Sequence, residues 1–131
     1  NGASCLPAPS QIAAACGLRQ CQSEIENMRQ SYLRRRDLIC SLIDQTLGLS
    51  IKKPKGAFYA FVNAKELTEF TGMNSRDLCM DLLKKTGVVT VPGSGFGDSG
   101  EGFIRITYAT SDENIKRGFE RIQGYIQGLG F

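Results

Sequence analysis

Histidine and tryptophan are missing from this 131-residue sequence, and the lack of histidine excludes two common chemistries. The usual zinc sites need imidazole or paired cysteines, and a serine nucleophile needs a histidine base. The five cysteines are odd in number and form no C-x-x-C pair. We therefore expect no metal site, and we interpret the cysteines as reduced, mostly buried thiols of a cytoplasmic protein.

Long apolar runs and a strong charge of either sign are also absent. No stretch approaches the roughly 18 to 20 apolar residues that cross a membrane, and no signal peptide is expected. The net charge of +3 is too small to indicate a nucleic acid or an acidic membrane as partner. Arg34–Arg36 is a local basic triplet within a helical pattern, where a solvated face is expected.

What remains is the composition of an ordinary globular domain. Hydrophobic residues make up 41% and charged residues 22%, which argues against a disordered chain. A chain of this length fits one domain and can bury a core without disulfides or metals. The first residue is Asn1 rather than methionine, so we expect a fragment or a processed product.

Apolar periodicity, capping residues and glycines predict four helices and three strands. The predicted helices are Gln11–Cys16 between a Ser10 cap and Gly17, Gln22–Leu47 before Gly48, a helix from a Ser75 cap to Gly87, and a last helix with a Thr110–Glu113 capping box. The predicted strands are Ala57–Val62, Val88–Val91 and Phe103–Ala109. This order indicates an α+β fold, in which a small, mainly antiparallel sheet is covered by helices, one of them long.

The glycine loop, residues Gly93–Gly102, contains two misleading matches. Gly95–Gly100 fits the dinucleotide fingerprint G-x-G-x-x-G, which works only where a helix begins at its end. Here a strand is expected to follow. Gly97–Gly100 is similar to the segment around a trypsin-like serine, but no histidine base exists. A connecting loop is the simpler interpretation.

Arg105 is the candidate functional residue. Strand alternation places Ile104 and Ile106 on one face and Arg105 on the other. A guanidinium in mid-strand is costly to desolvate unless an anion pairs with it, and its planar fork suits a carboxylate. An exposed arginine on an edge strand, or one paired with an internal Asp or Glu, explains the residue as well.

Three stretches resemble motifs of the class I aminotransferases, the aspartate aminotransferase family. Pro54–Phe61 is similar to P-x-G-A-F-Y-x-F, Gly87–Gly97 to G-V-x-x-x-P-G-S-x-F-G, and Gly100–Ala109 to G-E-G-x-x-R-x-x-x-A. They occur in the family's order, whereas Ser4–Ser10 only loosely resembles its S-N-P-x-S loop. The resemblance implies that residues 1–131 are a single domain, the C-terminal small domain of a longer fold type I enzyme without its cofactor-binding large domain.

By that resemblance Arg105 binds the substrate's α-carboxylate and Phe58 lines the substrate pocket, although plain core packing fits Phe58 as well. The parent would be a homodimer that exchanges an amino group between an amino acid and a 2-oxo acid through pyridoxal phosphate. The family's Schiff-base lysine lies upstream, and no lysine here matches a cofactor motif. The isolated chain is therefore expected to be inactive and to bind no cofactor.

A free-standing α+β ligand-binding or interaction module is the alternative. In that case Arg105 and the glycine loop would bind a carboxylate without catalysis. Related carbon–sulfur lyases keep the same arginine, so the resemblance favours transamination but leaves the reaction open. The amino acid is open as well, because in the family much of the side-chain selectivity comes from residues outside this stretch. An upstream reading frame that encodes a lysine-bearing large domain would favour the aminotransferase.

Overall fold

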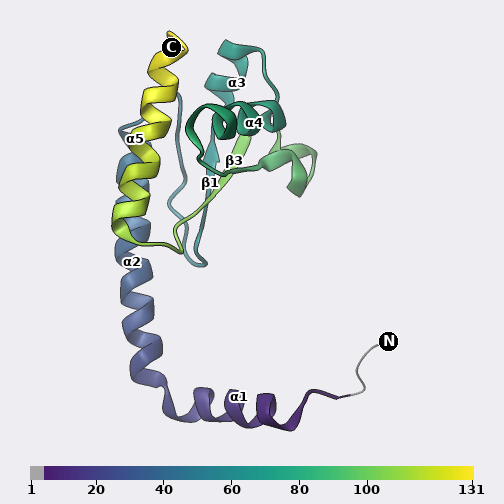
Figure 1. Cartoon of the computed structure of the whole chain (residues 1–131), viewed down its shortest axis with the longest axis vertical. Coiled ribbons are helices and arrows are strands. Elements are labelled where there is room, and N and C mark those ends of the chain that lie inside the picture. The colour runs from purple at the N-terminus through teal and green to yellow at the C-terminus, as the bar shows by residue number, and fades with distance from the viewer. Residues whose placement is uncertain (1–4) are drawn as a thin grey trace. The chain divides into compact units, whose positions relative to one another are not determined.

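The computed structural model describes residues 5–131 and divides into two compact units, one up to Leu33 and one from Arg34 onward (Figure 1). The first unit holds α1 (Ala8–Gln20) and the start of α2 (Gln22–Asp44). The second unit holds the rest of α2 and the sheet. The first residue of the Ser4–Ser10 match lies outside the described residues.

The first helix differs from its prediction at both ends. α1 spans Ala8–Gln20 rather than Gln11–Cys16, and Pro7 rather than Ser10 occupies the N-cap position. Prolines suit a first helical turn because the N–H they lack has no partner there, so the helix begins before Ser10. Gly17 lies inside α1 and does not end it, since a glycine within a helix costs only about 1 kcal/mol relative to alanine.

The sheet confirms the predicted α+β class. Its three strands are β1 (Tyr59–Asn63), β2 (Val91–Pro92) and β3 (Phe103–Thr107), in the order β1-β3-β2 with both pairs antiparallel. β2 is shorter than the predicted Val88–Val91 and shares only Val91 with it. Val89 in particular is 72% exposed, so this apolar run is not the buried strand that its composition suggested.

The helices of the second unit also correct several expected boundaries. α2 ends at Asp44 rather than near Leu47, and α3 (Lys65–Thr71), a short helix between β1 and α4, was not predicted. Gly48, which was expected to follow the end of α2, has a positive φ of 74°.

Two predicted helix caps are each wrong by one residue. Asn74, not Ser75, caps α4 (Ser75–Thr86) by accepting a hydrogen bond from the Asp77 backbone. In the same way Ser111, not the Thr110–Glu113 box, caps α5 (Asp112–Gly128). In both places two adjacent residues can accept the hydrogen bond, so local sequence alone does not choose between them.

The core lies between the helices and one face of the sheet, and α5 runs alongside the C-terminal part of α2 (Figure 1). α5 packs against this core with one apolar face. Its buried residues are Ile115, Phe119, Ile122, Tyr125 and Ile126. Within the described chain, no helix has both the length and the apolar character needed to cross a membrane.

Candidate functional site

Arg105 lies on the central strand of the sheet, on the face that the helices leave open. β3 pairs with β1 on one side and β2 on the other, so Arg105 is not on an edge strand. Ile104 and Ile106 point into the core, as the alternation predicted, while Arg105 is half-buried on the opposite face. Phe61 of β1 is its cross-strand partner.

Aromatic rings, rather than carboxylates, surround the Arg105 guanidinium. Its central carbon lies 4.2 Å from the centre of the Tyr59 ring and 4.6 Å from the centre of the Phe96 ring. Within residues 5–131 no Asp or Glu forms an ion pair with it. Neither alternative for Arg105 therefore holds among the described residues: Arg105 does not lie on an edge strand, and no internal acid pairs with it.

Phe58 lies just before β1 and is 40% exposed, so it is not a fully buried core residue. Its ring contacts Tyr59 at 4.6 Å, and its carbonyl accepts a hydrogen bond from the Tyr108 backbone. The preceding Ala57 has a φ of +60°, a left-handed conformation that costs a non-glycine residue about 1 kcal/mol or more. The buried Tyr108 hydroxyl donates to the Ala57 carbonyl and holds this turn, which no sequence signal indicated.

The glycine loop is closed at its base by two glycines in direct contact. A Cβ at Gly93 would lie 2.2 Å from the Gly100 carbonyl oxygen, and one at Gly100 would lie 2.0 Å from that of Gly93. Only glycine fits at either position. Between them are two short 3-10 turns, Gly93–Phe96 and Asp98–Gly100, and a strand follows as predicted. The loop therefore does not open a helix, as a dinucleotide fingerprint would require.

Glu101 ties the end of this loop to the start of α4. Its carboxylate accepts hydrogen bonds from the Ser75 backbone N–H at 2.7 Å and from the Ser75 hydroxyl at 3.0 Å. The Ser75 hydroxyl also lies 3.1 Å from that of Ser94. The Ser75 backbone N–H is the main cause of a lowered pKa at Glu101. Residue types alone did not single out Glu101, because its partner is distant in sequence.

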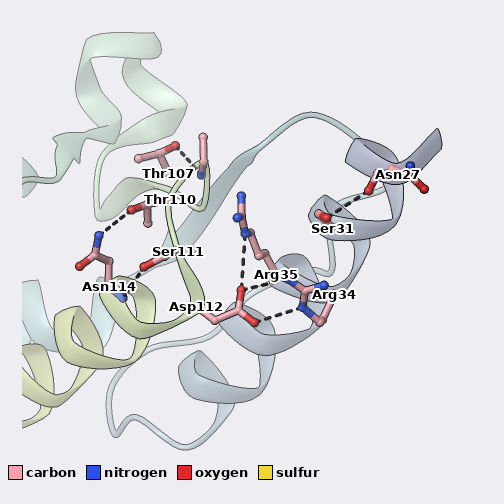
Figure 2. A network of polar contacts seen from close by, with 10 residues as sticks. Asn27, Ser31, Arg34, Arg35, Thr107, Thr110, Ser111, Asp112 and Asn114 are labelled. Atoms are coloured by element: carbon pink, nitrogen blue, oxygen red, sulfur yellow. Dashed lines mark hydrogen bonds and ion pairs between the residues drawn. The ribbon is translucent and has the colours of Figure 1, made fainter. Parts of the chain in front are cut away.

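The basic triplet does not form one solvated face. Arg34 is 61% exposed at its side chain, but Arg35 and Arg36 are 25% and 19% exposed. Consecutive helical residues point about 100° apart, so three in a row cannot share a face. Figure 2 shows Arg34 and Arg35 reaching Asp112 at the start of α5, where both form ion pairs with its carboxylate. These contacts lower the pKa of Asp112, and the hydrogen bond from Arg34 is the main cause.

Elsewhere in residues 5–131, lysines, cysteines and acidic side chains form no second cluster. The lysines are all exposed: Lys52, Lys53, Lys55, Lys65, Lys84, Lys85 and Lys116. Cys40 and Cys79 are buried, whereas Cys5 and Cys16 are exposed and Cys21 is half-buried, so the expectation of mostly buried thiols was wrong. Cys16 belongs to α1, which buries none of its residues. No group of three or more metal-ligating side chains gathers among the described residues.

Residues 1–122 match the protein family described as Aminotransferase class I and II. The aromatic-amino-acid aminotransferase 2 of Thermococcus litoralis is 42% identical over 115 residues, which are 86% of this chain and 28% of that protein. The aspartate aminotransferase of Pyrococcus horikoshii is 39% identical over 120 residues, 90% of this chain and 30% of that protein. The alanine aminotransferase structure from Pyrococcus furiosus superposes with a TM-score of 0.87 at 29% identity, covering 95% of this chain and 31% of that one.

Proposed function

Because this chain belongs to the class I and II aminotransferase family, we propose that it is the substrate-carboxylate-binding C-terminal domain of a longer, pyridoxal-phosphate-dependent aminotransferase. The chain spans about 30% of the length of its relatives. The observation that carries the proposal is Arg105, a half-buried guanidinium on the open face of the sheet that has no acidic partner among residues 5–131.

In this proposal Arg105 supplies the binding contact common to every substrate. All amino acids and 2-oxo acids carry a carboxylate next to the reacting carbon. Two parallel N–H donors of a guanidinium can grip that carboxylate and fix the orientation of the neighbouring carbon. The aromatic rings around Arg105 exclude part of the water and strengthen the charge-assisted bond.

Phe58 is proposed to line the pocket for the substrate. Its exposure, the contact of its ring with Tyr59, and its position beside a backbone turn held by Tyr108 support that role. The open aromatic face also fits the missing large domain as its covering partner, because exposed apolar patches of this kind mark interaction surfaces. Tyr59 and Phe61 are 38% and 40% exposed on this face.

The described residues do not fit pyridoxal phosphate as an internal aldimine. A lysine that forms a Schiff base is held in a desolvated or electropositive site, whereas every lysine here is exposed and Lys53 and Lys85 pair with acids. We therefore assign the catalytic lysine and the cofactor to the rest of the longer enzyme, and we expect this chain alone to be inactive. Borohydride reduction with the cofactor should leave no single lysine fully labelled by mass spectrometry; one such lysine would contradict the assignment.

The identity of the substrate pair is proposed only as a class, an amino acid and a 2-oxo acid. The names of the relatives include aspartate, aromatic and alanine aminotransferases, so the family does not fix the side chain. We further propose a cytoplasmic homodimer for the longer enzyme. The alternative, a free-standing ligand-binding module, predicts a gene without an upstream large domain, and sequencing the complete reading frame separates the two.

Arg105→Ala in the longer enzyme tests the proposal directly. Loss of a hydrogen-bonded charge partner in a desolvated site costs about 2–5 kcal/mol, or roughly 30- to several-thousand-fold in kcat/KM. Arg105→Lys should recover only part of this, because an ammonium lacks the fork. The melting temperature should change little, since Ile104 and Ile106 hold the strand in the core. Unchanged kinetics at saturating cofactor would remove Arg105 from the carboxylate site.

A further inference from the structure

Two aromatic rings hold the guanidinium of Arg105, and each comes from a different part of the sheet. Tyr59 belongs to β1, while Phe96 closes the first turn of the glycine loop. Both rings contact the same guanidinium carbon, at 4.2 Å and 4.6 Å from their centres. Because both rings are 38% to 52% exposed, neither is placed there by burial in the core.

A ring restrains an arginine without using up its hydrogen bonds. An aromatic face attracts the flat face of the guanidinium, and the N–H donors point outward in the guanidinium plane. An aspartate in the same place would occupy those donors and compete with an incoming carboxylate. Rings therefore suit an arginine that must be held in one position and still bind a ligand.

The position of Phe96 is itself fixed by neighbours. Its ring meets Phe61 edge-on at 6.0 Å, and Phe61 stacks on Phe103 at 5.1 Å. The loop that carries Phe96 is closed by the glycine contact at its base and tied to α4 through Ser94 and Ser75. The ring is thus presented to Arg105 by a supported loop.

From these contacts we propose that Tyr59 and Phe96 are positioning residues, which hold the Arg105 guanidinium ready for the substrate carboxylate. This inference rests on the proposed role of Arg105. It adds that efficient binding of the carboxylate needs the two rings as well as an arginine at this position. A long, flexible side chain must lose its rotamer freedom to bind, and the two rings remove that freedom before the substrate arrives.

The test uses the longer enzyme with Tyr59→Leu and Phe96→Leu, the ring-retaining Tyr59→Phe and Phe96→Tyr, and Arg105→Ala. Phe70→Leu is the matched control, because Phe70 is exposed to the same degree as Phe96 but its ring contacts Phe131. For each variant, kcat/KM is measured for the best amino-acid substrate and for its primary amide, which lacks the carboxylate. Each leucine variant should lower the value for the acid about 2- to 30-fold, the range expected for a cation–π contact.

The acid-to-amide ratio separates positioning from damage to the fold. Positioning predicts a reduced ratio in Tyr59→Leu and Phe96→Leu, and a normal ratio in Phe70→Leu and the ring-retaining variants. Equal losses of kcat/KM for acid and amide would overturn the inference. An unchanged acid-to-amide ratio in both leucine variants, together with a reduced ratio in Arg105→Ala, would also overturn it. If Arg105→Ala also keeps the ratio, the proposed function itself fails.

Discussion

The first and last helices of the chain have the same secondary structure but different support. α5 buries five of its 17 residues, whereas α1 buries none of its 13. The apolar side chains of α1 are instead exposed, with Ile12 at 70% and Leu18 at 75%. An isolated helix of this length is marginal in water. The contrast teaches that the second unit carries its own core, while α1 is a helix that buries none of its own residues.

The largest expected effect comes from deleting a core ring of the second unit. Phe119 is 3% exposed, so Phe119→Ala should lower the free energy of unfolding by about 3–5 kcal/mol. Ile12→Ala in α1 should change it by less than about 0.5 kcal/mol. Urea denaturation followed by circular dichroism measures both. If Phe119→Ala fails to fold, Phe119→Leu gives a smaller, measurable loss; an equal loss from Ile12→Ala would break the comparison.

An intermediate, pH-dependent effect is expected at the link between Glu101 and Ser75. The folded pKa of Glu101 lies below its ordinary value of 4.5, so the carboxylate stabilises the fold above that pH. The stabilisation is lost as the pH falls through the lowered folded pKa. Glu101→Gln should therefore be less stable than the wild type at pH 7, and the difference should shrink in acid.

Melting temperatures of both proteins between pH 7 and pH 3 check this prediction. Glu69→Gln, at an exposed carboxylate of α3, is the matched control. If the difference in melting temperature between wild type and Glu101→Gln stays constant down to pH 3, the ionised carboxylate does not have this stabilising role.

The smallest effect is a local one in α1. A Cβ at Gly17 would meet nothing within 4 Å, so Gly17→Ala should favour the helix by about 0.5–1 kcal/mol. Far-ultraviolet circular dichroism should report more helix, while the urea midpoint of the second unit stays where it is. A raised midpoint would mean that α1 and the core unfold together.

The sequence predicted what depends on periodicity and not what depends on distant partners. Alternation placed Arg105 opposite Ile104 and Ile106, because a strand has a strict period of two. The rings of Tyr59 and Phe96 beside it come from other segments, and no local pattern brings them together. The orientation of Arg105 on its strand was therefore predictable, whereas its aromatic surroundings were not.

Helix boundaries show the same limit at shorter range. Asn74 and Ser75 can both cap α4. In the structure Asn74 does so, and Ser75 instead donates hydrogen bonds to Glu101, which is distant in sequence. α3 is a single short helix with one buried residue, Leu67, and offers too little periodicity to be recognised. The link from Arg34 and Arg35 to Asp112 likewise joins segments that no local signal connects.

The contact between Gly93 and Gly100 also divides the glycine loop into parts that differ for protein engineering. At the base, any other amino acid would drive a side chain into a carbonyl group, so neither glycine belongs in a mutagenesis library. At the tip, Gly95 faces open space and Asp98 and Ser99 are exposed. Those three positions can take new side chains in the loop that carries Phe96, whose ring contacts Arg105, while the base keeps the loop closed. This makes the loop a practical place to redesign substrate preference.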